Sequence, residues 1–267
     1  MHRHERIGEL MILFQCIVFG FFPVLLSYSG GKIPPLFFAA TSTFLSGLVI
    51  FLYTVLSGKT QEIFNRKAYL PMAKLVFFIS AGYSLFYIGG SQSSGISISI
   101  LAQMEIFFTF LFSALIFGEV INSRKIVSAL GVFFGSLLIV YNGTFSIHPG
   151  NLLMILATVL FPFANWYAQQ AMKIISPQTL LFLRSMLSSI IYLVLSFWWE
   201  HTWQTGVQEF EENLGLILIN GLLLFSVTKI LWYEGLKRID LSKAITIGSS
   251  FTAFGFLYSI FLLKEVP

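Results

Sequence analysis

Three charged side chains lie well inside long apolar segments of the sequence: Glu105, Arg184 and Lys229. A charged group in such a segment is costly unless it is paired or reached by water, so each one indicates either a function or a structural tie. A carboxylate can bind a proton or a substrate amine, whereas a guanidinium or ammonium group can bind a substrate carboxylate. These residues are the first candidates for binding a small polar molecule.

Glu105 lies about ten residues into its apolar segment, which is roughly 15 Å along a helix. Thr109 and Ser113 follow at steps of four residues, so one face of that helix is polar. On the functional interpretation, Glu105 and Thr109 line a cavity and Glu105 binds a substrate amine or a proton. On the alternative interpretation, Glu105 pairs with a cation on a neighbouring helix and holds the helices together.

The two cations have similar alternatives. Arg184 could bind a substrate carboxylate, but a structural tie, or a long side chain that reaches back to the membrane surface, is the favoured interpretation. Lys229 has Tyr233 one turn later, and it would favour an anionic group such as Glu105 if it is buried. On the other interpretation, the long side chain of Lys229 extends to the nearby cytoplasmic end of its segment.

Two prolines within apolar segments predict helix breaks. Pro162 removes a backbone donor in the middle of its segment and is followed by Asn165 and Trp166, while Pro23 interrupts the first segment. Broken helices near the membrane midplane often mark the binding sites of transporters. The alternative is a packing kink that neighbouring helices satisfy.

Aromatic residues make up 17% of the chain. Several of them could form the wall of a cavity for apolar or aromatic substrates, although packing or an interfacial belt is the better interpretation for any single one. These candidates are Tyr83, Tyr87, Trp166, Trp232 and Tyr233.

The segments that carry these residues have the length and composition of membrane spans. The chain has 267 residues, of which 56% are hydrophobic and 10% charged, against about 25% charged in soluble domains. A hydrocarbon core about 30 Å thick needs about 20 apolar residues per helix. Nine such spans are predicted, at residues 8–28, 34–57, 70–90, 95–118, 124–142, 149–171, 177–199, 214–236 and 243–263.

The basic residues predict the orientation of these spans. With the N-terminus in the cytoplasm, eleven of the Lys and Arg residues fall in cytoplasmic segments and two, Lys32 and Lys264, fall outside. Cytoplasmic loops carry an excess of Lys and Arg, so the bias favours this orientation. The net charge of +4 reflects these loops, and no basic run is long enough to bind nucleic acid.

The sequence also repeats itself. A shift of 142 residues pairs Gly8 with Gly150 and Pro35 with Pro177, and a shift of 146 pairs Glu119-Val120 with Glu265-Val266. The repeat unit holds five spans, an odd number, so the second copy crosses the membrane in the opposite sense, as in many secondary transporters. We expect an all-α polytopic membrane protein of two inverted five-span repeats, residues 1–145 and 146–267, with the tenth span missing after Pro267.

The chain offers little for catalysis. Its four histidines, His2, His4, His148 and His201, all lie in tails or loops, so no histidine within a span is available as a base or metal ligand. The paired glycines lack the Lys-Ser/Thr that completes a phosphate-binding loop. We predict that the protein is not an enzyme and that it has no cofactor and no metal.

The sequence resembles the drug/metabolite transporter superfamily, and within it the EamA-like ten-span family. The resemblance covers essentially the whole chain and is carried by Phe117-Gly118-Glu119, Arg124-Lys125 and Ala129-Leu130-Gly131, and by the related Leu263 to Pro267. Family members often have Glu-Pro where this sequence has Glu105-Ile106. The resemblance implies export or exchange of small metabolites through a central cavity between the halves, without ATP.

Two functions from different classes remain open at this stage. The first is a secondary transporter of small metabolites, such as amino acids or amphipathic compounds, in the plasma (bacterial inner) membrane, working by alternating access. The second is a non-transporting membrane protein: a receptor, a lipid-handling scaffold or a subunit of a complex. Membrane lipid and a small-molecule substrate are the expected partners, and the sequence leaves proton or ion coupling and the oligomeric state undetermined.

Overall fold

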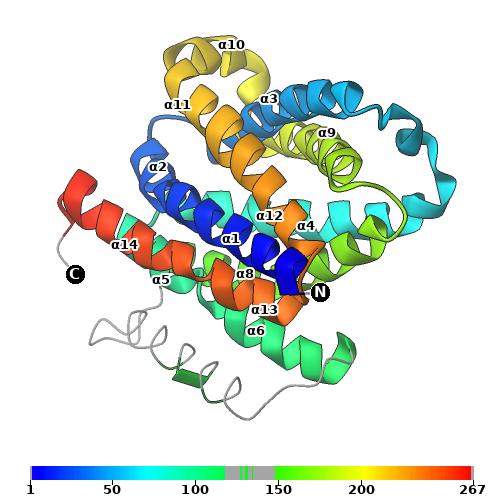
Figure 1. The fold of residues 1–267 in the computed structure, drawn as a ribbon. Coiled ribbons are helices and arrows are strands. Elements are labelled where there is room, and N and C mark those ends of the chain that lie inside the picture. The colour runs from blue at the N-terminus through cyan, green and yellow to red at the C-terminus, as the bar shows by residue number, and fades with distance from the viewer. Residues whose placement is uncertain (1, 118–126, 128–129, 132–133, 135–147, 266–267) are drawn as a thin grey trace.

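The computed structural model describes residues 2–117, 127, 130–131, 134 and 148–265, and within them the chain is helical (Figure 1). Eight helical segments are long and apolar enough to cross a membrane. They run from His4–Ser29, Pro35–Leu56, Arg66–Gly90, Gly95–Phe117, Pro149–Met172, Pro177–Trp199, Leu214–Leu236 and Leu241–Leu263. The prediction of an all-α polytopic fold is confirmed, and these eight segments match eight of the nine predicted spans. The remaining prediction, 124–142, falls largely outside the described residues.

Several of these segments consist of two or more helical pieces. The α-helices are α1 (His2–Phe19), α2 (Phe21–Ser29), α3 (Pro35–Leu56), α4 (Tyr69–Gly90), α5 (Gly95–Leu101), α6 (Met104–Phe112), α8 (Pro149–Met172), α9 (Pro177–Leu195), α10 (Thr202–Glu212), α11 (Leu214–Leu218), α12 (Thr228–Leu236), α13 (Leu241–Gly248) and α14 (Ser250–Leu263). Short π-helical turns cover Ser113–Phe117, Ser196–Glu200 and Ile219–Val227, and 3-10 turns cover Thr60–Phe64 and Arg66–Ala68.

Three segments are interrupted near their middles. The first breaks at Gly20, between α1 and α2, because Pro23 has no N–H to offer the carbonyl of Phe19. The fourth breaks at 102–103, between α5 and α6, and the last at Ser249, between α13 and α14. The predicted break at Pro162 does not occur, because α8 continues through this proline as one helix.

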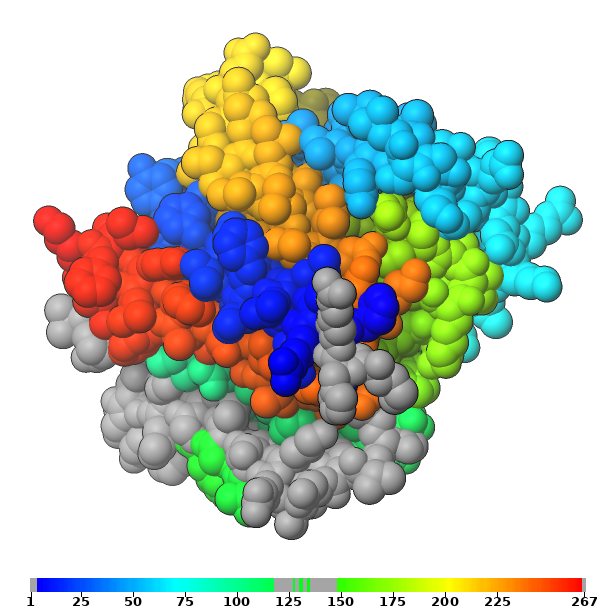
Figure 2. Space-filling model, viewed as in Figure 1, coloured from blue at the N-terminus to red at the C-terminus, as the bar shows by residue number. Residues whose placement is uncertain are grey.

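The helices pack mainly across the two predicted repeats. The extensive contacts join α4 with α8, α3 with α9, α1 with α12, and α5 with α14. On the face seen in Figure 2, α1 lies between α12 and the α13–α14 segment. Small residues allow this proximity: a Cβ atom on Gly89 in α4 would lie 2.5 Å from the carbonyl oxygen of Gly150 in α8. The core is therefore an interface between the two halves of the chain.

Carboxylates from one half close the N-termini of helices in the other. Glu200 follows α9, and its two oxygens accept hydrogen bonds from the backbone N–H groups of Leu36 (2.7 Å) and Phe37 (2.9 Å) in α3. Glu265 follows α14 and accepts 2.9 Å bonds from the first two N–H groups of α5, those of Gly95 and Ile96. These N–H groups have no partner within their own helix, so a carboxylate satisfies them and the positive end of the helix dipole together.

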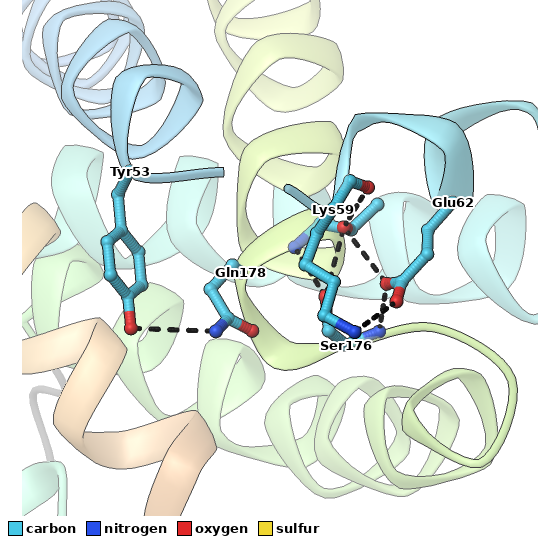
Figure 3. A network of polar contacts seen from close by, with 6 residues as sticks. Tyr53, Lys59, Glu62, Ser176 and Gln178 are labelled. Atoms are coloured by element: carbon cyan, nitrogen blue, oxygen red, sulfur yellow. Dashed lines mark hydrogen bonds and ion pairs between the residues drawn. The ribbon is translucent and has the colours of Figure 1, made fainter. Parts of the chain in front are cut away.

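The reciprocal contact lies at the other end of the α3–α9 pair (Figure 3). Glu62 follows α3 and accepts bonds from the N–H of Ser176 (2.6 Å) and the hydroxyl of Thr179 (3.1 Å) at the start of α9. Lys59 lies 3.4 Å from the same carboxyl group. The two antiparallel helices are thus fastened to each other at both ends.

We predict that Glu62→Gln lowers the thermal stability of the protein in detergent. Burial alone raises the pKa of the Glu62 carboxyl, but hydrogen bonds from Ser176, Thr179 and Lys59 outweigh this effect and lower the pKa. Because the folded-state pKa lies below the unfolded value, the stabilisation is present above the unfolded pKa and is lost as pH falls through the folded one. The substitution should cost about 0.5–1 kcal/mol near neutral pH and less in acid.

Glu211→Gln is the matched control, because it makes the same change of charge at an exposed position of α10. It should leave the melting temperature unchanged. An equal loss in both variants, or a loss at Glu62 that does not vary with pH, would contradict the capping role.

Candidate functional site

A cavity of about 90 Å³ lies where the three interrupted segments meet. Residues from all three breaks reach it: Phe19 and Phe22 beside the first, Ala102 and Glu105 beside the second, and Ser249 at the third. The other lining residues come from these segments and from α4, α8, α9 and α12. They are Gln15, Ile79, Tyr83, Phe86, Ile106, Phe161, Asn165, Arg184, Lys229, Trp232, Tyr233, Ile245, Gly248 and Phe251. Backbone interruption, charge and aromatic surface therefore coincide at one place.

Glu105 lies in the first turn of α6, directly after the break in its segment, and faces α8. Its carboxylate accepts a hydrogen bond of 3.0 Å from the side-chain amide of Asn165. It makes no ion pair within 4.0 Å with Lys229 or Arg184, so the cation partner considered from the sequence is not in contact with it. A second bond across the breaks joins the amide of Gln103 to the hydroxyl of Thr252 at 2.6 Å.

Arg184 reaches the cavity from α9 and does not extend to the membrane surface. It is 3% exposed, and its guanidinium carbon lies 5.6 Å from the ring centre of Tyr83 and 5.7 Å from that of Tyr233. Its Nε has no hydrogen-bond partner among the described residues. A buried donor without a partner is costly, so this group is available to a polar ligand.

Lys229 enters the cavity from α12. It is 8% exposed, and its ammonium nitrogen lies 3.7 Å from the ring centre of Phe19, 5.7 Å from that of Tyr83 and 5.5 Å from that of Phe225. Contact with ring faces stabilises a cation but does not neutralise its charge.

Seven of the ten sequence-predicted side chains line this cavity: Glu105, Asn165, Arg184, Lys229, Tyr83, Trp232 and Tyr233. The other three lie elsewhere. Tyr87 is fully buried and accepts a 2.8 Å hydrogen bond from Asn220, and Thr109 is fully buried in α6 outside the cavity lining. Trp166 stacks on Phe117 with ring centres 4.6 Å apart and borders a second hollow of about 500 Å³ beside α12 and α13.

Sequence reasoning missed several lining residues, although the internal repeat held a signal for them. The 146-residue shift that pairs Tyr87 with Tyr233 also pairs four couples of lining residues, and the 142-residue shift pairs one. These couples are Tyr83 with Lys229, Phe86 with Trp232, Ala102 with Gly248, Glu105 with Phe251, and Phe19 with Phe161. The cavity thus uses equivalent positions of both repeats, but a charged residue in one repeat has an uncharged counterpart in the other.

The described residues contain no cluster of three His, Cys, Asp or Glu side chains that could hold a metal ion. The arrangement is suited to non-covalent binding: two cations and one carboxylate can bind complementary groups, and the rings can hold an apolar body.

Comparison with known proteins agrees with the resemblance found in the sequence. The EamA-like transporter family matches residues 6–141 and 148–267. A relative from Bacillus subtilis (strain 168), named as the uncharacterized transporter YoaV, is 26% identical over 243 residues, which cover 88% of this chain and 81% of the relative. A solved crystal structure shares the fold, with a TM-score of 0.75 at 16% identity over 97% of this chain and 89% of that one. Since the family matches nearly the whole chain, the protein belongs to the EamA-like transporter family.

Proposed function

We propose that this multi-pass membrane transporter is a secondary transporter, an exporter or exchanger of small metabolites that works by alternating access in the cytoplasmic (bacterial inner) membrane. The observation that carries the proposal is the buried cavity of charged and aromatic residues at the meeting point of three broken helices. Substrate sites at the interface of inverted repeats, formed by discontinuous helices, are typical of secondary transporters.

The packing indicates that the moving parts are bundles of helices drawn from both repeats. The extensive helix contacts cross between the repeats, and residues of both repeats line the cavity. We propose residues 1–145 and 146–267 as the two inverted repeats. A rocking movement of one such bundle against the other would open the cavity first to one side of the membrane and then to the other. The pair α3–α9, which is fastened at both ends, would move as one body.

The direct test is counterflow in proteoliposomes that contain the purified protein. Vesicles loaded with an unlabelled metabolite pool should accumulate a labelled compound of the same class, with saturable kinetics. Empty vesicles and vesicles with heat-denatured protein are the controls. A lack of exchange across a broad panel, with protein shown to be folded, would contradict a transport function.

Glu105→Gln should lower the rate of counterflow by about tenfold or more without reducing the amount of folded protein in the membrane. The carboxylate is proposed to bind a proton or a cationic group during transport, and the amide that replaces it cannot ionise. The substitution keeps the shape of the side chain and an oxygen that Asn165 can donate to. Glu211→Gln serves as the control outside the cavity. Normal transport by the Glu105 variant would remove this residue from the mechanism.

The proposed cytoplasmic N-terminus can be tested by cysteine labelling, because the chain has a single cysteine, Cys16, and it is fully buried. Lys67 and Gln204 are exposed at opposite ends of the spans. A membrane-impermeant maleimide should label Gln204→Cys in intact cells, and should label Lys67→Cys only after the cells are permeabilised. The reverse pattern would show that the N-terminus faces outward.

A further inference from the structure

The charges of the cavity do not cancel. Among the described lining residues, two are cations, Arg184 and Lys229, and one is an acid, Glu105, which leaves one positive charge. A proton that moved from Lys229 to Glu105 would leave this sum unchanged. With both cations charged, a bound anion would compensate this positive charge, which favours an anionic ligand over a neutral one.

Neither cation forms an ion pair in the described part of the chain. The carboxylate of Glu105 is engaged by Asn165 at 3.0 Å. The Arg184 side chain is buried, with 3% of the residue exposed, and its Nε has no hydrogen-bond partner among the described residues. A carboxylate can accept two parallel bonds from Nε and a terminal nitrogen of a guanidinium group, so a bound carboxylate could satisfy the Nε that lacks a partner.

The apolar part of the cavity wall and the cavity volume limit the size and polarity of the ligand. Much of the cavity wall is apolar and includes the rings of Phe22, Phe86, Phe161 and Phe251. A cavity of about 90 Å³ holds roughly six to nine water-sized groups, at 10–15 Å³ each. This space fits a short branched or aromatic carbon skeleton with a single polar end.

We propose that the cavity binds a small organic monocarboxylate, a monoanion with an apolar body, in preference to zwitterions, cations and neutral analogues. Its carboxylate would face Arg184 and Lys229, and its apolar body would lie among the phenylalanine rings. This inference rests on the proposed transport function and specifies its substrate class.

The test is competition and counterflow with compounds that share a branched isobutyl group and differ in the charge of their polar end. The series is 4-methylpentanoate (monoanion), 4-methylpentanamide (neutral), 4-methylpentylamine (cation), leucine (zwitterion) and isobutylmalonate (dianion). The monoanion should exchange with the lowest KM, about tenfold or more below the others.

Substitutions in the cavity should change this preference in opposite directions. Arg184→Gln and Lys229→Gln should each raise the KM for the monoanion by about tenfold, and reduce its advantage over the amide. Glu105→Gln, which removes the negative charge, should tighten equilibrium binding of the monoanion, measured by its thermal stabilisation of the protein. Lys74→Gln removes an exposed cation that does not line the cavity, and it should leave the preference unchanged.

A purely structural role for the cations predicts a different result. In that case, Arg184→Gln and Lys229→Gln would lower the amount of folded protein, or would weaken binding of the monoanion and the amide by the same factor. Either pattern would overturn the inference. Preference for leucine, the amine or the amide would also overturn it, while leaving the transport function intact. If neither this series nor the broad metabolite panel is exchanged, the transport function itself fails.

Discussion

The fold depends on one constraint: a backbone N–H or C=O group inside a bilayer must find its partner within the protein, because lipid offers none. Continuous helices meet this requirement without help. Helix ends do not, and in this protein three helix N-termini are closed by carboxylates from the other half of the chain. Glu200 closes α3, Glu62 closes α9, and Glu265 closes α5. The same bonds that satisfy the backbone therefore also hold the two halves together.

The interruptions inside the spans extend this logic to the cavity. The breaks at 102–103 and at Ser249 are 146 residues apart, at equivalent positions of the two repeats, and the bond from Gln103 to Thr252 links them. Groups freed from regular helix geometry are tolerated where they border a cavity. The polar side chains of Glu105, Asn165 and Arg184 lie at the same place, where they can face one another and a ligand in preference to lipid.

Positions that the sequence repeat pairs with each other line the cavity, but their side chains differ in charge. Lys229 corresponds to Tyr83, and Glu105 corresponds to Phe251. Symmetry of the backbone is what an exchange of conformations between the halves requires. Asymmetry of charge is what selective recognition of one kind of molecule requires, because a ligand with a polar end and an apolar end binds in one orientation. The two properties are independent, so they can change separately.

The sequence by itself determined the class of fold, eight spans to within a few residues, and the identity of the buried charged groups. It could do so because span length and the cost of intramembrane charge are local properties of the chain. Pro23 also marked its break, since the missing N–H is a property of one residue.

Only the tertiary structure decided which of these groups meet. The partner of Glu105 is Asn165, 60 residues away in the sequence, whereas the sequence alone also allowed a pair with Lys229. Helix α8 continues through Pro162, where it packs against α4, and the breaks at 102–103 and Ser249 occur without a proline and are joined by the bond from Gln103 to Thr252. Such outcomes depend on close packing between segments far apart in the chain, and no local pattern records them.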